Sequence, residues 1–295
     1  MTEPPLTVPD EPPPAAPHVA LRAPSPDAST PRRGWSLRTA WRAWLSAVQF
    51  LTRVPVPSGW LGDGPLGAAE LRLAAAFFPW VGIVVGLITG AAIWLSSQFW
   101  PMWVAVGIGL ATEAWLTGAL HEDALADFCD AFGGGWTRED VLRILDDSRV
   151  GSFGTLGLVL AVLLRAGTLA SLEPGSLLAA AVASAAAGRW AMLPAMAALP
   201  PVAGRESLAR HFGRLVTARD VGLGGLGMLA GALPLVWIFP WRMAVAAAGL
   251  GILVTCFVAY VRRRIGGMTG DCLGCLCYVA QIWILLCASA RWPTL

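Results

Sequence analysis

The chain has 295 residues, of which 56% are hydrophobic and only 14% are charged, and its mean hydropathy is +0.62. Soluble domains carry about 25% charged residues, so this composition argues against an ordinary soluble enzyme and excludes a wholly disordered chain. A net charge of +2 gives no general attraction for nucleic acid, and we expect no such partner. The remaining class is an all-α polytopic integral membrane protein, embedded in the lipid bilayer through apolar runs of about 20 residues.

The first residues differ in composition from the rest. Residues 1–34 are rich in proline and small polar residues, and we predict a disordered tail there, ahead of a membrane-embedded domain at 35–295. In residues 36–57, large apolar residues recur at helical spacing between arginines. This pattern predicts an amphipathic helix, which either lies in the membrane interface or packs as a first helix on the bundle.

Seven apolar runs follow, each long enough to cross about 30 Å of hydrocarbon at about 1.5 Å per residue. We place the spans near 73–97, 102–120, 153–172, 176–199, 223–240, 243–260 and 272–290. With the N-terminus in the cytoplasm, most of the 21 basic residues, all of them arginine, fall on the cytoplasmic side, as the positive-inside rule requires. The longer loops 121–152, 200–222 and 261–271 then lie inside as well, so we expect the chemistry at the cytoplasmic face.

The segment after the second predicted span is rich in acids. Asp123, Asp127 and Asp130 are spaced i, i+4, i+7, so a helix that continues here would place the three carboxylates on one face. Like charges repel at that spacing, and a divalent cation such as Mg²⁺, held by carboxylate oxygens and substrate phosphates, would offset the repulsion. His121 is near enough to orient Asp123 or to transfer a proton. The alternative is a solvated acidic helix end without a metal.

Other polar features accompany these acids. Gly133 and Gly134 come next in the chain, and they predict a flexible turn whose backbone approaches a ligand closely. Arg165 and Arg189 lie inside apolar spans, where a charge is costly and faces a partner or a cavity. Arg189, near the middle of its span, is a candidate for binding a ligand. Its alternative is a structural ion pair with Glu113, the only acid well inside a span.

Several motif blocks resemble the cobalamin synthase family, also called adenosylcobinamide-GDP ribazoletransferase. HEDALADFCDAFGGG at 121–135 and DSRVGSFG at 147–154 are similar to the family's HxDGLADxxDG and DSRxGxxG blocks. QFLTRVPVP at 49–57, FFPWVG at 77–82 and GGMTGDCLG at 266–274 match further blocks in the same order. The chain departs from the pattern where Ala124 and Ala131 replace usual glycines. Tyr278 stands where the family usually has Glu, which puts the role of that glutamate in doubt.

The resemblance implies a Mg²⁺-dependent transferase of the bacterial inner membrane. It would join adenosylcobinamide-GDP to α-ribazole or its 5′-phosphate and release GMP, late in cobalamin biosynthesis. Asp147 would then be a further ligand or the base, and Arg149 would clamp a phosphate through its planar fork. Besides the metal set Asp123, Asp127 and Asp130, and His121 as a catalytic residue, the expected ligand-binding residues are Arg189, Thr269, Asp271, Gly133 and Gly134.

Two other protein classes are alternatives to this family. Another intramembrane Mg²⁺-dependent phospho-alcohol or prenyl transferase would also use acidic repeats, but the arrangement of this chain's second acidic block, DDSRVG, differs from theirs. A transporter would show internal repeats or broken helices, and we find no convincing repeat. The sequence leaves the natural acceptor and the formation of a homo-oligomer open.

Overall fold

A computed structural model describes residues 36–62, 66–202 and 216–291, and the predicted tail 1–34 lies outside them. Within these ranges the only regular structure besides helices is an isolated bridge between Pro201 and Met268. This confirms the all-α class. The helices are α1 (Leu37–Leu51), α2 (Ser58–Leu61), α3 (Ala68–Ala76), α4 (Phe78–Ser97), α5 (Met102–Thr117), α6 (Leu120–Gly134), α7 (Arg138–Leu145), α8 (Ser152–Ala170), α9 (Pro174–Ala198), α11 (Ala218–Ile238), α12 (Pro240–Ile265) and α13 (Gly270–Ser289).

The predicted membrane spans are present as long apolar helices. Six helices (α4, α8, α9, α11, α12 and α13) are long and apolar enough to cross a membrane, and α5 with α6 makes a seventh span if that bent pair is counted as one. Two predicted spans contain a break in the helix. The run 73–97 is divided at Phe77 into α3 and α4, where Pro79 occupies the first turn of α4 and lacks a backbone donor. The run 102–120 ends as a helix at Thr117.

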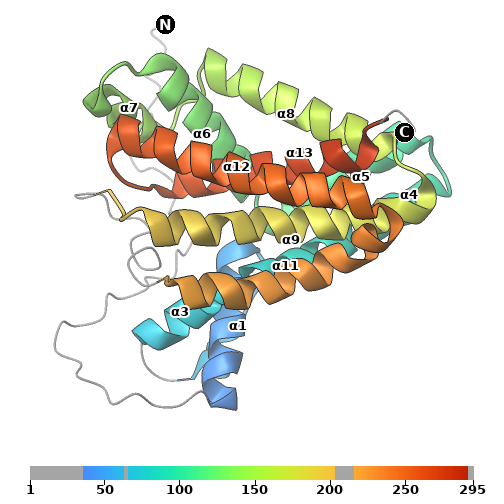
Figure 1. The fold of residues 1–295 in the computed structure, drawn as a ribbon, viewed down its shortest axis with the longest axis horizontal. Helices are drawn as coiled ribbons and strands as arrows, with labels where there is room; N and C mark the ends of the chain where they lie inside the picture. The colour runs from blue at the N-terminus through green and yellow to red at the C-terminus, as the bar shows by residue number, and fades with distance from the viewer. Residues whose placement is uncertain (1–35, 63–65, 203–215, 292–295) are drawn as a thin grey trace, which may run out of the picture.

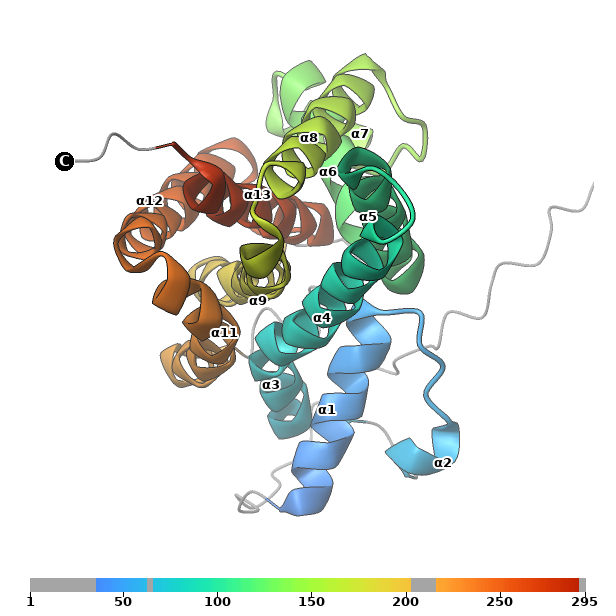
Figure 2. The same ribbon diagram turned by 90° about the vertical axis from the view of Figure 1, so that its right-hand side faces the viewer.

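The centre of the bundle is α9, which packs against α4, α11 and α13 (Figures 1 and 2). Small residues allow these helices to approach closely. A Cβ on Gly82 would lie 2.5 Å from the carbonyl oxygen of Ala185, and one on Gly86 would lie 2.6 Å from Cα of Val182. The α4–α9 contact therefore depends on glycine at both positions, and it buries α9 in the core.

Residues 37–51 form the predicted first helix, α1, and this helix packs on the bundle. It contacts α3 and α4, and Arg42 pairs with Glu70 of α3 at 3.0 Å. Leu45 and Leu51 of this helix are buried, and Leu51 belongs to the main core. The contacts favour the bundle-packed alternative. The position of α1 relative to the membrane interface stays a prediction.

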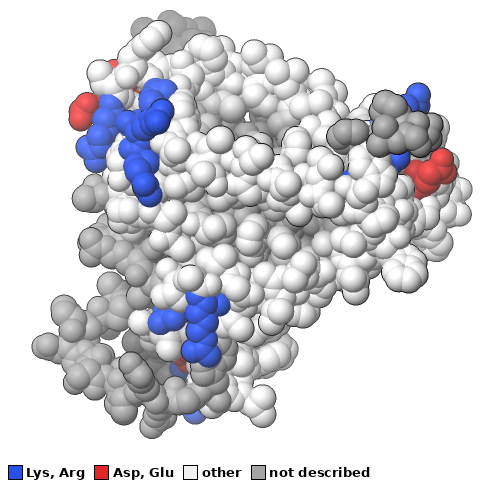
Figure 3. Space-filling model, in the orientation of Figure 1, with Lys and Arg blue, Asp and Glu red and all other residues white. Residues whose placement is uncertain are grey.

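One end of the bundle gathers the segments that carry the motif blocks. The N-terminal ends of α8, α11 and α13 and the C-terminal ends of α9 and α12 lie together at the left in Figure 1. We call this the loop end. In Figure 3, basic side chains gather there, while the band between the two ends shows almost none. This matches helices that cross a bilayer, since charges avoid hydrocarbon. That the loop end faces the cytoplasm stays a prediction.

Candidate active site

A cavity of about 190 Å³ lies at the loop end between α1, α6, α9 and α13. Three of its lining residues are ionisable: His121 and Asp123 from α6, and Asp271 from the first turn of α13. The other lining residues are apolar or glycine, and they are Phe50, Leu120, Ala124, Met192, Met196, Gly270, Leu273 and Gly274. A mostly apolar wall with a few convergent polar groups is typical of a small-molecule site.

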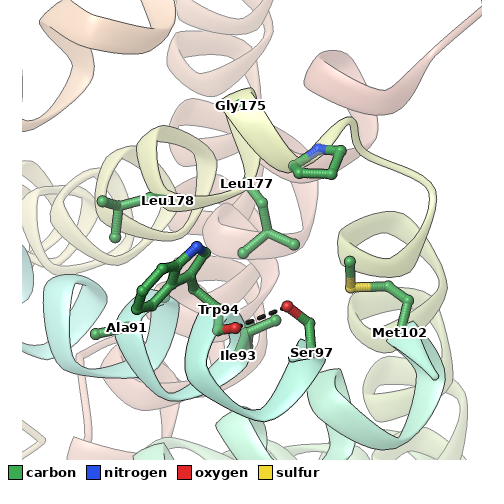
Figure 4. A pocket seen from close by; sticks show the side chains of 10 residues that line it. Ala91, Ile93, Trp94, Ser97, Met102, Gly175, Leu177 and Leu178 are labelled. Atoms are coloured by element: carbon green, nitrogen blue, oxygen red, sulfur yellow. Dashed lines mark hydrogen bonds between the residues drawn. The ribbon is translucent and has the colours of Figure 1, made fainter. Parts of the chain in front are cut away.

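A larger cavity, of about 330 Å³, lies at the opposite end of the bundle, between α4, α5 and α9 (Figure 4). Its lining includes Trp94, Met102 and Leu177, and the hydroxyl of Ser97 donates to the carbonyl of Trp94 at 2.7 Å. No Asp, Glu, His or Arg is among the residues around it. It therefore lacks the charged groups that phosphate chemistry needs, so the smaller cavity at the loop end is the candidate active site.

The acidic segment is not a continuation of α5. The chain bends by 89° between α5 and α6, and both Gly118 (φ 70°) and Ala119 (φ 55°) adopt the left-handed conformation. For a non-glycine residue such as Ala119 this conformation costs about 1–2 kcal/mol. The aspartates therefore lie on a separate helix. The long loop expected at 121–152 is wrong, because most of it forms α6 and α7. The bend places Asp123, in the first turn of α6, at the cavity.

The three aspartates nevertheless share a helix, as their spacing predicts. The carboxylate of Asp127 is repelled by those of Asp123, Asp130 and Asp271, so the acid from α13 belongs to the same cluster. Within the described part of the chain, Asp123 and Asp127 make no ion pair and no side-chain hydrogen bond. No group of three or more Asp, Glu, His or Cys residues among those described is arranged to hold a metal ion alone.

Asp130 holds the start of α8 against α6. Its carboxylate accepts hydrogen bonds from the backbone N–H of Gly151 at 2.6 Å and of Gly154 at 2.8 Å. The negative charge also interacts favourably with the dipole at the N-terminus of α8. A Cβ on either glycine would collide with this carboxylate. The glycines of the DSRVGSFG block therefore serve the α6–α8 junction.

Asp147 and Arg149 form an exposed pair in the loop before α8. Nε and Nη2 of Arg149 donate to the Asp147 carboxylate at 2.9 and 2.7 Å, and the backbone N–H of Arg149 donates at 3.1 Å. Hydrogen bonds from Arg149 lower the pKa of Asp147 to about 2. The Arg149 side chain is 87% exposed. Asp147 is therefore a weak base that is already bound to an arginine.

Comparison with known proteins identifies the family of the chain. A profile of the family described as cobalamin-5-phosphate synthase matches residues 43–289. The chain belongs to this family. It is therefore a membrane-embedded transferase of cobalamin synthesis.

Relatives named adenosylcobinamide-GDP ribazoletransferase are similar over most of their length. The protein from Ralstonia pickettii is 38% identical over 253 residues, covering 85% of this chain and 96% of the relative. The one from Leptothrix cholodnii is 40% identical, covering 79% and 89%, and the one from Rhizobium johnstonii is 37% identical, covering 83% and 94%. No solved structure matches the chain.

Several residues of the family blocks have structural positions rather than places in the cavity. Gly133 and Gly134 do not form the expected flexible turn, because they complete the last turn of α6 and pack near Phe153. Thr269 is buried and caps α13, its hydroxyl accepting from the N–H of Cys272 at 3.2 Å. This cap fixes the first turn of α13 and so places Asp271 at the cavity.

Arg189 is fully buried in α9 and is not among the residues that line the cavity. Its Nη1 donates to the carbonyl of Ala185 at 3.1 Å, while Nε and Nη2 have no partner among the described residues. The alternative of an Arg189–Glu113 ion pair is wrong, because Glu113 pairs with Arg165 at 2.7 Å. The charge of Arg189 acts on His121, so it lies behind the cavity wall.

A buried polar network around Arg165 is the main feature that sequence reasoning missed. Nη2 of Arg165 bonds Glu113 and also Gln281 of α13 at 2.9 Å, and Nη1 lies 3.8 Å from Glu122. The ring of Tyr278 lies 5.1 Å from the guanidinium carbon, a cation–π contact. Tyr278, which departs from the family pattern, thus neighbours Arg165. The only sequence signal for this network was a set of charged residues inside apolar runs.

Proposed function

We propose that the chain joins adenosylcobinamide-GDP to α-ribazole or α-ribazole 5′-phosphate and releases GMP. A ribose hydroxyl oxygen of the acceptor attacks the phosphorus that carries cobinamide, and the bond from that phosphorus to the bridging oxygen breaks. GMP leaves with the bridging oxygen, and a base takes the hydroxyl proton. The observation that carries the proposal is the carboxylate cluster beside the mostly apolar cavity, in a chain whose relatives are named for this transfer.

The carboxylates Asp123, Asp127 and Asp271 fit a magnesium site in their chemistry. They supply hard oxygen ligands, and described cations do not pair with Asp123 or Asp127. Mg²⁺ binds through one or two carboxylates together with substrate phosphates and water, which agrees with a cluster that does not enclose an ion by itself. When bound, the ion would supply positive charge to the diphosphate oxygens.

The other residues have distinct tasks in this proposal. Asp130 positions α8 and thereby the loop that carries Arg149. Asp147 holds Nε and Nη2 of Arg149, which leaves Nη1 for a phosphate oxygen of the donor. His121 lines the cavity and its Nε2 has no partner among the described residues. His121 is therefore better placed than Asp147 to receive the proton of the acceptor hydroxyl.

The proposal is tested by GMP release in proteoliposomes. Wild-type protein given adenosylcobinamide-GDP and α-ribazole should release GMP with Mg²⁺ and lose this activity when the metal is chelated. Asp127→Asn should lower turnover by at least about 100-fold, as expected when a group that stabilises transition-state charge is removed. Glu139→Gln, at an exposed acid of α7, is the matched control and should keep full turnover. Wild-type turnover by Asp127→Asn at ordinary Mg²⁺ would overturn the metal role.

The proposal also includes a location. The arginine distribution supports a multi-pass protein of the bacterial inner membrane with the loop end in the cytoplasm, where the soluble substrates have access. Labelling a single cysteine introduced at exposed Trp136, in a variant whose native cysteines are replaced, tests this with a reagent that does not cross membranes. Labelling of inverted vesicles but not of intact spheroplasts is the expected result.

A further inference from the structure

Arg53 lies on the bend between α5 and α6. Its backbone N–H donates to the carbonyl of Leu116, in the last turn of α5, at 2.7 Å. A Cβ built on Gly118 would meet the Arg53 side chain, with Cζ at 3.1 Å and Cδ at 3.2 Å. The guanidinium therefore lies along the bend instead of extending freely. Gly118 is required both for its positive φ and for this close approach.

The guanidinium of Arg53 has no acidic partner in the described part of the chain, although Asp123 follows the bend within a few residues. The residue is exposed. An arginine presents five donors in a rigid fork that matches phosphate oxygens. A guanidinium that lies along the bend without an acidic partner among the described residues is therefore arranged to meet an anion.

The first turn of α6 supplies further donors at the same place. Ala119 gives α6 no side-chain cap, and the backbone N–H groups of Leu120 and His121 have no partner among the described residues. Both residues line the cavity, and so does Phe50, which precedes Arg53 by three residues. His121 is only 2% exposed, and its Nε2 lacks a partner in the described chain. Unpaired donors at a helix N-terminus attract anions.

The aspartates of α6 lie between the donors at the bend (Arg53 and the first turn of α6) and Arg149. Asp123 and Asp130 are seven residues apart, about 10 Å along α6 at about 1.5 Å per residue. Arg149 lies beyond Asp130, whose carboxylate bonds Gly151, and Arg53 lies beyond Asp123 at the bend. The two phosphates of a diphosphate share one oxygen and do not span that length. The two arginines therefore suit two separate anionic groups.

We propose that Arg53 and the first turn of α6 bind a phosphate monoester, the 5′-phosphate of the acceptor, while the donor diphosphate lies between the carboxylates and Arg149. This inference rests on the proposed function and adds the residue that distinguishes the phosphorylated acceptor from α-ribazole. The same chemistry would also suit a phosphate of the donor, so the test compares the two substrates.

The test is steady-state kinetics of Arg53→Gln in proteoliposomes, with α-ribazole and with α-ribazole 5′-phosphate as acceptors. The KM for the phosphorylated acceptor should rise at least about tenfold, the change expected when hydrogen bonds to a charged group are lost. The KM for α-ribazole and the KM for the donor should not change. Arg53→Lys, which keeps the charge but loses the fork, should fall between wild type and Arg53→Gln. Arg263→Gln, at an exposed arginine of α12, is the matched control and should behave as wild type.

Four results of these kinetics would contradict the inference about Arg53. Equal losses with both acceptors, a raised donor KM, an unchanged KM in Arg53→Gln, or failure of the wild type to use the phosphorylated acceptor would each overturn the inference. If Arg53→Gln does not fold, the same comparison is made with Arg53→Lys, and equal effects on both acceptors again overturn it. Absence of GMP release by wild-type protein with either acceptor would instead refute the proposed function.

Discussion

The buried pair of Glu113 and Arg165 leads to a quantitative prediction about stability. Two arginines, Arg165 and Arg189, and two glutamates, Glu113 and Glu122, lie together among α5, α6, α8 and α9, so their formal charges cancel. Replacing Glu113 by Gln leaves one uncompensated positive charge in the apolar core. Removing one partner of a buried ion pair costs about 3–5 kcal/mol.

The structure indicates the lower end of that range for Glu113→Gln. The amide oxygen of the introduced glutamine would still accept from Arg165 and from the hydroxyl of Thr89, which bonds Glu113 at 3.0 Å. A loss of about 3 kcal/mol corresponds to about a 100-fold shift in the unfolding equilibrium, at about 1.4 kcal/mol per tenfold. Arg165→Gln should cost a similar amount, because it leaves an excess negative charge.

The double variant Glu113→Gln/Arg165→Gln should be more stable than either single variant, because it restores neutrality and keeps a hydrogen-bonded pair. The expected coupling is about 2 kcal/mol, within the usual range for residues in contact. Reversible unfolding of the purified protein in mixed micelles measures all three free energies. Glu173→Gln, at an exposed acid before α9, is the control and should stay within about 0.5 kcal/mol of wild type. Additive costs, or rescue of Glu113→Gln by Arg189→Gln instead of Arg165→Gln, would refute the pairing.

Two further predictions concern the helix contact and the loop before α8. Gly86→Ala should destabilise the protein by about 1–3 kcal/mol, as overpacking does, because the new Cβ meets Cα of Val182. Gly107→Ala is the control: it has open space around it and should be neutral or stabilising in the same unfolding assay. Because Arg149 lowers the pKa of Asp147 from 3.8 to about 2, this carboxyl stays ionised as the pH falls from 7 to 4, and any stabilisation from the pair is lost as the pH falls further toward 2. Asp147→Asn should therefore leave the acid limb of the pH–rate profile unchanged above pH ~4, and a shifted limb would show that Asp147 titrates during catalysis.

The candidate site was partly predictable from sequence. The spacing of Asp123, Asp127 and Asp130 determined that one helix would carry all three, and the motif block around Asp271 indicated a second contribution from far along the chain. The association of Asp271 with these aspartates required the packing of α13 on α6. The flexible turn predicted at Gly133 and Gly134 was wrong, because consecutive glycines allow a turn but do not prevent a helix whose end is held by neighbours.

The sequence by itself determined the approximate limits of six of the seven predicted membrane spans, because hydrocarbon requires about 20 apolar residues with internally satisfied backbones. Only the tertiary structure decided which buried charges meet: Glu113 pairs with Arg165, 52 residues away, and not with Arg189. It also decided the 89° bend at Gly118 and Ala119. Side-chain partners and bends depend on how the helices pack around α9. The pattern of residues along one helix does not specify which helices pack against it or at what angle.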